Sequence, residues 1–328
     1  MRKDKIRWGI LGAGGIAHAF ASDFKFMQHA ELVAVAASDI DRARSFAAQY
    51  QIPQALSYEN LYNSKDVDAV YIATIHHLHF KQTFRCLKMG KGVLCEKPVT
   101  INDKEFKTLA RIAKKKSVFL MEAMWTYFLP SLQKAKQWVD EGRIGNIKVI
   151  QADFSYPMDK EIQAKLFDPN LAGGSLLELG IYPIALAYYF TDKKPEKIMA
   201  SGQLTPTGVD ERLGVILQYG DITATLFSSI STRMTNMGRI FGETGYIEIP
   251  DFWRAYGCTL YNKDYIITET YEDKRSSHGF IYEMQHANDL ILACKYESTL
   301  MPHSRSNAIQ ETMTEIRKQI GLEYPMEK

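Results

Sequence analysis

The sequence predicts an α/β protein of two domains: a doubly wound parallel sheet, then an α+β domain with a mainly antiparallel sheet. Three observations support this fold class. The chain has 328 residues, more than the roughly 100–200 usual for one domain. Short apolar runs alternate with segments of helical period from Lys5 to Glu122, and beyond Trp125 the apolar residues follow a period of two. The change of pattern predicts domains of residues 1–122 and 123–328.

The first domain is predicted from short strands separated by helices. Strands joined by helices form β-α-β units and a parallel sheet, as in a Rossmann domain. The predicted strands are IRWGIL (6–11), ELVAVAAS (31–38), DAVYIAT (68–74), GVLCE (92–96) and SVFLME (117–122).

The second domain is predicted from longer alternating runs. Alternation with period two is typical of an antiparallel sheet that is covered by helices on one face. The predicted strands include 147–156, 197–204, 212–219 and 222–231, and the predicted helices are 131–140, 173–190, 282–295 and 306–321.

Composition favours a small-molecule partner in the cytoplasm. The 40 basic residues balance 38 acidic ones, which is too even for attraction to nucleic acid or an acidic membrane. The amino terminus predicts a first strand rather than a signal peptide, and no apolar run is expected to span a bilayer. The four cysteines lack C-x-x-C spacing, so neither disulfides nor zinc is indicated.

A glycine motif follows the first predicted strand. Gly12-x-Gly14-x-x-Ala17 fits the G-x-G-x-x-G/A pattern of dinucleotide-binding domains. Gly12 permits the tight turn, Gly14 lets a pyrophosphate approach, and Ala17 allows close packing of helix and strand. The N–H groups at the start of the helix would then bind the anion. The alternative is a tight turn with no ligand.

The end of the second predicted strand bears on which dinucleotide binds. Asp39 would accept a hydrogen bond from the ribose of NAD, whereas Arg42 would accommodate the 2′-phosphate of NADP, and Ser38 offers a further donor. Asp39 is equally suited to cap the following helix. We expect NADP(H) to be preferred, with NAD(H) possible.

The stretch Glu96-Lys97-Pro98 ends the predicted strand 92–96. Ligands of open parallel sheets bind at the carboxyl ends of strands, so Glu96 and Lys97 are expected at the cofactor site. Pro98 biases Lys97 towards extended backbone. Lys97 would then stabilise a developing alkoxide, although a surface lysine that merely ends a strand is the alternative.

Taken together, GAGGIA (12–17), EKP (96–98), GGSLLELGIYP (173–183) and the order of the flanking motifs resemble a known family. It is the glucose-fructose oxidoreductase, inositol dehydrogenase and rhizopine catabolism (Gfo/Idh/MocA) family, and the similarity is greatest to its dimeric dihydrodiol dehydrogenase, or NADP-dependent D-xylose dehydrogenase, branch. The resemblance implies an open-faced sheet in the second domain, a homodimer formed through it, and hydride transfer between the nicotinamide and a secondary alcohol or carbonyl of a small sugar or cyclic trans-diol.

The resemblance also implies roles for individual residues. Lys97 matches the catalytic lysine, and Tyr182 matches the acid/base group of the dihydrodiol branch, where most sugar-oxidising relatives carry histidine. Glu178 stands where many relatives have aspartate, and it shares a predicted helix face with Tyr182. Gly180 between them predicts close packing at that turn. Trp125, Phe154 and Tyr182 are expected to bind substrate.

The expected cofactor-binding set combines the motif with the resemblance: Gly12, Gly14, Gly15, Ile16, Ser38, Asp39, Arg42, Thr74, His79, Glu96 and Lys97. His76, His77 and His79 are close together, but no carboxylate or cysteine completes a zinc set, so no metal is expected.

Two other functions stay open. An NAD(H)-dependent dehydrogenase of inositol-like cyclitols is compatible with Asp39. A non-catalytic sensor of dinucleotides would use the same scaffold, but it would not need both Lys97 and Tyr182.

Overall fold

The chain forms two compact units in the computed structural model, which describes residues 4–159 and 164–327. The first unit consists of residues up to 125 together with 276–307, and the second consists of 126–275 and 308 onwards. The predicted ranges 1–122 and 123–328 were contiguous, so they did not include the return of the chain to the first unit. Residues 1–3, at the start of the predicted first domain, lie outside the described residues.

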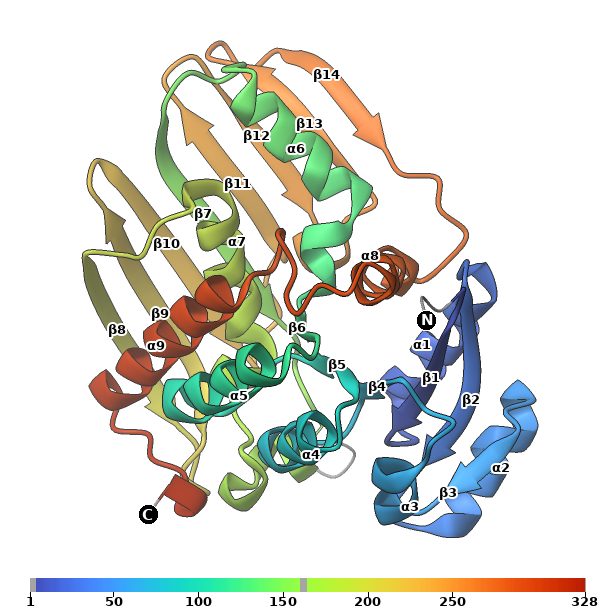
Figure 1. Ribbon diagram of the computed structural model, residues 1–328. Helices are drawn as coiled ribbons and strands as arrows, with labels where there is room; N and C mark the ends of the chain where they lie inside the picture. The colour runs from blue at the N-terminus through green and yellow to red at the C-terminus, as the bar shows by residue number, and fades with distance from the viewer. Residues whose placement is uncertain (1–3, 160–163, 328) are drawn as a thin grey trace. The chain divides into compact units, whose positions relative to one another are not determined.

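The first unit contains a six-stranded parallel sheet with strand order β3-β2-β1-β4-β5-β6 (Figure 1). The order runs outwards in both directions from the β1–β4 pair, so the predicted doubly wound sheet is confirmed. Its strands are β1 (Ile6–Leu11), β2 (Ala30–Ala36), β3 (Gln54–Leu56), β4 (Ala69–Ile72), β5 (Gly92–Glu96) and β6 (Leu120–Ala123).

Side-chain caps begin several helices of this unit. Asp39, Ser57 and Asn102 each accept a hydrogen bond from a backbone N–H in the first turn of the helix that follows. The helices are α1 (Gly15–Asp23), α2 (Ile40–Tyr50), α3 (Tyr58–Asn63), α4 (His76–Lys88) and α5 (Asp103–Lys116), with a short 3₁₀ turn at Phe24–Phe26.

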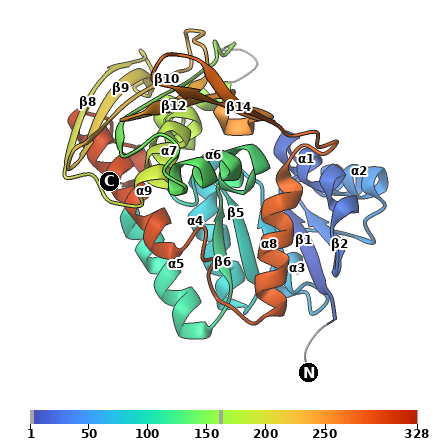
Figure 2. The same cartoon turned by 90° about the horizontal axis from the view of Figure 1, so that it is seen from above.

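Helix α8 (Phe280–Leu292) packs beside α1 and β1 of the first unit (Figure 2). The carboxylate of Asp23 accepts hydrogen bonds from the backbone N–H groups of His278, Gly279 and Phe280 at 2.9–3.0 Å. These donors have no partner inside the helix, and the negative charge suits a helix start. The indole of Trp8 donates to Asn288 Oδ1 at 3.0 Å. These contacts explain why residues 276–307 belong to the first unit.

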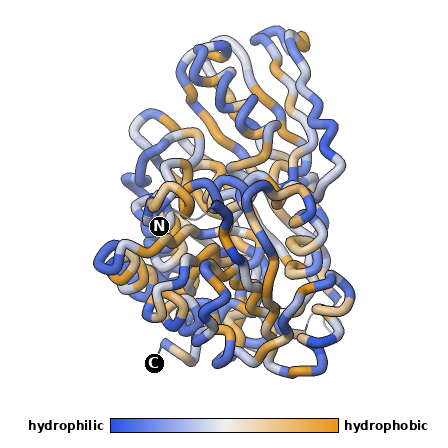
Figure 3. The backbone as a smooth tube through the Cα atoms, turned by 45° about the vertical axis from the view of Figure 1, so that its right-hand side comes forward, coloured by the Kyte–Doolittle hydropathy of each residue, from blue (hydrophilic) through white to orange (hydrophobic). Residues whose placement is uncertain are grey.

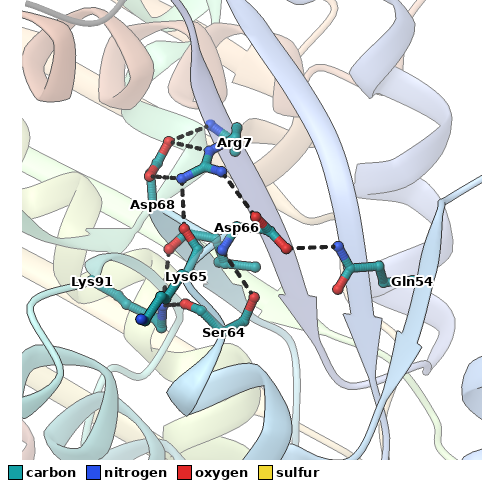
Figure 4. Close-up of polar contacts among 8 residues, drawn as sticks. Arg7, Gln54, Ser64, Lys65, Asp66, Asp68 and Lys91 are labelled. Atoms are coloured by element: carbon teal, nitrogen blue, oxygen red, sulfur yellow. Dashed lines mark hydrogen bonds and ion pairs between the residues drawn. The ribbon is translucent and has the colours of Figure 1, made fainter.

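Buried and half-buried charges fix the amino ends of the parallel strands (Figure 4). The guanidinium of Arg7 donates to both oxygens of Asp68, at 3.1 and 2.9 Å, and to the carbonyl of Lys65 at 2.7 Å. Lys91 Nζ donates to the carbonyls of Ser64 and Val67 at 2.5 and 2.9 Å. This network joins the beginnings of β1, β4 and β5 and is structural.

The second unit contains an eight-stranded sheet with strand order β14-β13-β12-β11-β7-β10-β9-β8. Among these described strands only β7 and β10 pair in parallel, so the predicted mainly antiparallel sheet is confirmed. Its strands are β7 (Ile147–Ser155), β8 (Lys197–Leu204), β9 (Asp210–Tyr219), β10 (Ile222–Ser229), β11 (Met237–Gly242), β12 (Gly245–Pro250), β13 (Gly257–Asn262) and β14 (Ile267–Glu272).

Helices cover one face of this sheet. Helix α6 (Pro130–Asp140) packs on β12 and β13, and α7 (Ile181–Thr191) packs on β7 and β10. The remaining elements are α9 (His303–Gln319), a π-helical turn (Leu176–Gly180), and 3₁₀ turns at Trp125–Phe128, Ala164–Phe167, Pro169–Leu171, Phe252–Arg254 and Pro325–Glu327.

One helical stretch, residues 169–191, is long and apolar enough to cross a membrane, contrary to the expectation from the sequence. Its most apolar window is 89% buried inside the protein, as for a core helix. Figure 3 shows hydrophobic and hydrophilic residues interleaved along much of the backbone.

Candidate active-site residues

The glycine loop between β1 and α1 has the shape that the motif predicts. Gly12 has a φ of +111°, and a Cβ there would lie 2.5 Å from the carbonyl oxygen of Ala73, so only glycine fits. Gly14 and Gly15 face open space, since a Cβ at either position would have no atom within 4 Å. Gly14 begins α1 without a side-chain cap, which leaves the first N–H groups available to an anion. Ile16 is exposed beside them.

Ser38, Asp39 and Arg42 lie exposed after β2. Asp39 Oδ1 accepts a hydrogen bond from Asp41 N–H at 2.8 Å, so Asp39 caps α2. Arg42 Nη2 donates to the carbonyl oxygen of Ala13, within the glycine loop, at 3.2 Å. The guanidinium is therefore brought to the glycine loop itself.

Lys97 follows directly on β5 and is half-buried. The Lys97–Pro98 peptide bond is cis. The segment after it is held from two sides: Val99 N–H donates to Glu122 Oε1 at 2.9 Å, and the carbonyl of Pro98 lies 2.7 Å from His79 Nδ1. Glu122 belongs to β6, so neighbouring strand ends hold the backbone that presents Lys97.

His79 is fully buried and joins two loops of the candidate cofactor site. Besides Pro98, its Nε2 lies 3.1 Å from the carbonyl of Thr74, the loop residue after β4. Burial, with the charges of His76 and Lys97 adding to it, lowers the pKa of His79 to about 4. The ring is then neutral at pH 7 and donates to only one carbonyl, and we assign this bond to Pro98, the shorter contact. His79 thus holds the backbone at Pro98, the residue that follows Lys97.

Glu96 belongs to a buried acidic pair. The hydroxyl of Tyr71 on β4 donates to Glu96 Oε1. Glu283 on α8 is fully buried, and neither of its oxygens has a hydrogen-bond partner among the described residues. Burial and the nearby charge of Glu96 raise the pKa of Glu283 well above its ordinary range. Sequence reasoning did not identify Glu283, because only the return of α8 brings it near Glu96.

Trp125, an expected substrate-binding residue, stacks on Phe280 at the start of α8. The ring centroids are 4.6 Å apart with an interplanar angle of 16°. Both rings are about 5% exposed. Phe280 was not predicted, because the two rings meet only when the chain returns to the first unit.

In the second unit, Glu178 and Tyr182 lie on a segment that begins at Gly173. The regular helix predicted over 173–190 is corrected: residues Leu176–Gly180 form a π-helical turn, and α7 begins at Ile181. A Cβ at Gly180 would lie 2.9 Å from Ser228 Oγ, so the close packing predicted at this glycine is present and comes from β10. Such π turns are frequent at functional sites. Glu178 is half-buried and Tyr182 is 6% exposed.

Aromatic rings surround Tyr182 within the second unit. Phe154 on β7 meets the Tyr182 ring edge to face, with centroids 5.3 Å apart. Trp253 stacks on Phe154 at 4.9 Å and lies 6.3 Å from Tyr182. Tyr156 contacts both Phe154 and Trp253, and Arg233 lies 5.6 Å above its ring. Phe154 was expected here. Trp253 was missed because its 3₁₀ turn is about a hundred residues from Phe154 in sequence. Tyr156, two residues from Phe154, was missed although it could have been considered with it.

The described residues contain no group of three or more histidine, cysteine or acidic side chains that would hold a metal ion. His76 and His79 contact each other ring to ring, with centroids 5.9 Å apart.

The doubly wound parallel sheet and its glycine loop define a dinucleotide-binding Rossmann domain. The chain matches the profile of the oxidoreductase family with an NAD-binding Rossmann fold over residues 6–124, and that of the GFO/IDH/MocA C-terminal domain over residues 132–248. It belongs to the Gfo/Idh/MocA family, and the resemblance drawn from the motifs is confirmed.

Curated relatives match along almost the whole chain. Trans-1,2-dihydrobenzene-1,2-diol dehydrogenase of Mus musculus is 36% identical over 332 residues, covering 98% of this chain and 99% of the relative. The protein of the same name from Homo sapiens is 32% identical over 333 residues, with the same coverage.

Solved structures of similar fold include two bacterial enzymes. A variant of a 3-ketoreductase from Actinomadura kijaniata, in complex with TDP-benzene and NADP, has a TM-score of 0.87 at 23% identity, covering 96% of this chain and 98% of its own. An aldose-aldose oxidoreductase from Caulobacter crescentus has a TM-score of 0.87 at 24% identity, covering 96% and 97%. At these identities the likeness concerns the fold.

Proposed function

We propose that this protein is an NADP(H)-preferring oxidoreductase that transfers hydride between the nicotinamide and a secondary alcohol or carbonyl of a small sugar or cyclic trans-diol. The family membership establishes an NAD(P)-dependent oxidoreductase. The observation that carries the finer proposal is the aromatic cluster around Tyr182, because flat apolar faces beside one phenolic hydroxyl suit a ring that bears hydroxyl groups. The names of the curated relatives support the same substrate class.

The first unit fits a dinucleotide. The open space at Gly14 and Gly15 and the uncapped start of α1 suit a pyrophosphate, and Arg42 supports the choice of NADP(H). The expected contacts of Ile16, Ser38, Thr74, His79 and Glu96 are part of this proposal. When bound, the nicotinamide supplies or accepts the hydride.

Lys97 and Tyr182 are the proposed catalytic pair. The Tyr182 hydroxyl exchanges a proton with the substrate oxygen, and the Lys97 ammonium stabilises charge on that oxygen and favours the tyrosinate. The hydrogen bonds of the Pro98 carbonyl with His79 and of Val99 N–H with Glu122 support this role for Lys97. A backbone that is fixed in this way holds the Lys97 side chain in a narrow range of positions. Glu178 is proposed to take part in catalysis beside this pair. Trp125 and Phe154 are proposed to contact the substrate.

The test is nicotinamide absorbance with NADP⁺ and NAD⁺ separately, over aldoses, cyclitols and trans-cyclohexanediols. Wild type is run beside Lys97→Met, Tyr182→Phe and Lys104→Met, an exposed lysine on α5 that serves as the control. We expect turnover of one substrate class, and a loss of kcat of roughly 100-fold or more in the first two variants, with cofactor binding retained. Full activity in Tyr182→Phe at every pH would remove Tyr182 from the mechanism.

The two alternatives give different results in the same assay. A dinucleotide sensor would bind NADPH and oxidise nothing in the panel. A cyclitol dehydrogenase would bind NADH at least as well as NADPH and turn over inositol. The presence of both Lys97 and Tyr182 favours the enzyme over the sensor.

We also propose a homodimer formed through the eight-stranded sheet, on the face away from α6 and α7. A depression of about 640 Å³ on strands β7 to β11 is lined by apolar side chains, among them Met199, Ile216 and Phe227, and also by the charged Asp153 and Arg239. Met199 is 50% and Ile216 39% exposed, which is costly in water unless a partner covers them. A cytoplasmic location is proposed from the four unpaired cysteines.

A further inference from the structure

A buried tyrosine outside the aromatic cluster touches the beginning of the segment that carries Tyr182. Tyr324 is fully buried, and its hydroxyl donates to the carbonyl oxygen of Gly173 at 2.6 Å. Burial raises the pKa of this hydroxyl well above its ordinary value, so it remains a protonated donor. Gly173 and Tyr324 are 151 residues apart in sequence.

The segment that carries Tyr324, residues 322–327, is itself fixed by a buried ion pair. Arg317 near the end of α9 donates to both carboxylate oxygens of Glu327, at 2.5 and 2.9 Å. The Arg317 side chain is only 4% exposed, and its guanidinium lies 5.0 Å from the centre of the Tyr324 ring. Such a two-pronged bond is rigid, so the Tyr324 hydroxyl has a defined position.

A carboxylate holds the same turn. Asp210 at the start of β9 is fully buried, and its Oδ2 accepts a hydrogen bond from Leu176 N–H at 2.6 Å. Gly174 has a φ of +111°, and a Cβ there would collide with Asp210 Oδ1, so glycine admits the carboxyl group. Gly174 N–H donates to the carbonyl of Leu166 at 2.8 Å.

These bonds fix residues 173–176 on both sides, where the π turn that leads to Tyr182 begins. Rotation of this turn would rotate the following helix as a unit, and the Tyr182 hydroxyl would move with it. Misplacement of a catalytic group by about 1 Å lowers rates by as much as 100-fold.

We propose that Tyr324 and Asp210 are positioning residues for Tyr182: their buried hydroxyl and carboxyl group hold the turn 173–176 and thereby set where the Tyr182 hydroxyl lies. The inference rests on the proposed role of Tyr182 in the reaction. It assigns a part in catalysis to two residues that belong to neither the aromatic cluster nor the expected cofactor-binding set.

The variant Tyr324→Phe removes only the hydroxyl that donates to Gly173. Tyr188→Phe is the control on the same segment, because the buried hydroxyl of Tyr188 contacts the Ala308 carbonyl at 3.2 Å and Thr312 Oγ1 at 3.0 Å and does not touch residues 173–176. For both we would measure Tm, the affinity for NADPH, kcat across pH, and amide hydrogen exchange in peptides spanning 173–182.

We expect Tyr324→Phe to lower kcat roughly 10-fold and to shift the pH–rate profile, with NADPH affinity unchanged and faster exchange at Leu176. Tyr188→Phe should change Tm by a similar amount and leave kcat within about twofold. Equal kcat values and pH profiles in the two variants, despite similar Tm, would overturn the proposal.

Hydrogen exchange separates this inference from the proposed function. If wild type oxidises no substrate, the proposed function fails. Faster exchange of residues 173–182 in Tyr324→Phe but not in Tyr188→Phe would still support the proposal that Tyr324 fixes the turn 173–176. Unchanged exchange in Tyr324→Phe would refute the proposal that the Tyr324 hydroxyl fixes this turn, whether or not the protein is active.

Discussion

Arg42 and Asp39 offer a dinucleotide opposite charges from the first turn of one helix. In the structure Asp39 uses one oxygen to cap α2, while Arg42 reaches the glycine loop through the carbonyl of Ala13. A carboxylate that caps a helix repels a 2′-phosphate, but an arginine beside it offsets that charge and adds fork-shaped donors. We propose that the balance between these two side chains decides which of NADP(H) and NAD(H) is preferred.

Arg42→Ala should therefore raise the KM for NADP⁺ about 10-fold or more, because a hydrogen bond to a charged group contributes about 1.5–3 kcal/mol. The KM for NAD⁺ should stay within about twofold. Arg44→Ala is the control, since Arg44 lies on the same helix but pairs with Asp41 at 2.9 Å. An equal rise in the KM for both cofactors would show that Arg42 supports the glycine loop and does not contact the 2′-phosphate.

At the scale of an element, the segment from Gly173 to Thr191 is held by side chains from elsewhere in its unit. Asp210 accepts from its first turn, Ser228 packs on Gly180, and the hydroxyl of Tyr324 reaches Gly173. An apolar helix of this kind has no polar face of its own to set its orientation. The buried polar contacts supply that orientation. Because one of them involves the carboxyl group of Asp210, the stability of the fold depends on pH.

Burial raises the pKa of Asp210 from its ordinary value of 3.8 to about 7, against the hydrogen bond from Leu176 and the charge of Arg317, which favour ionisation. The folded protein therefore binds this proton more tightly than the unfolded chain. The stabilisation is full below about pH 4 and is lost as the pH rises towards 7.

Asp210→Asn cannot ionise, yet its amide oxygen can still accept from Leu176. Relative to wild type, the variant should gain about 2–3 kcal/mol in free energy of unfolding between about pH 5 and pH 8. Urea denaturation at several pH values measures this, with Asp168→Asn, another carboxylate that accepts a backbone N–H, as the control. A difference from wild type that is constant with pH would contradict the assignment.

At the scale of the whole molecule, the chain crosses between its two compact units and returns before it ends. The first unit is completed by α8, which Asp23 and Asn288 fix to it, and the second is completed by most of α9 and by the Tyr324 segment. Helices α6 and α7 cover one face of the eight-stranded sheet, and the exposed Met199 and Ile216 line the depression on β7–β11.

The double variant Met199→Glu/Ile216→Glu should be a monomer of about 37 kDa, whereas wild type should have twice that mass in light scattering after gel filtration. Placing like charges on a self-complementary apolar face opposes association. Tyr265→Glu is the control, because Tyr265 is 78% exposed at the tip of the β13–β14 hairpin. A wild type that stays monomeric at micromolar concentration would remove the dimer from the proposal.

The sequence by itself determined the features that depend on neighbouring residues: the strand and helix periods of the parallel sheet, the glycine loop from Gly12, and the placement of Lys97 at a strand end. Local patterns carry this information because backbone conformation and side-chain alternation act over a few residues. Through resemblance, the motifs also predicted roles for Phe154 and Tyr182, whose rings are in contact in the structure.

Only the tertiary structure decided which distant side chains meet. It brought Trp253 to Phe154, Glu283 to Glu96, and Tyr324 to Gly173, and it replaced a predicted regular turn with a π turn against Ser228. Such contacts join residues about 50 to 190 positions apart, and no local period records them. They depend on the packing of whole elements, in which burial and the need to satisfy polar groups select one arrangement.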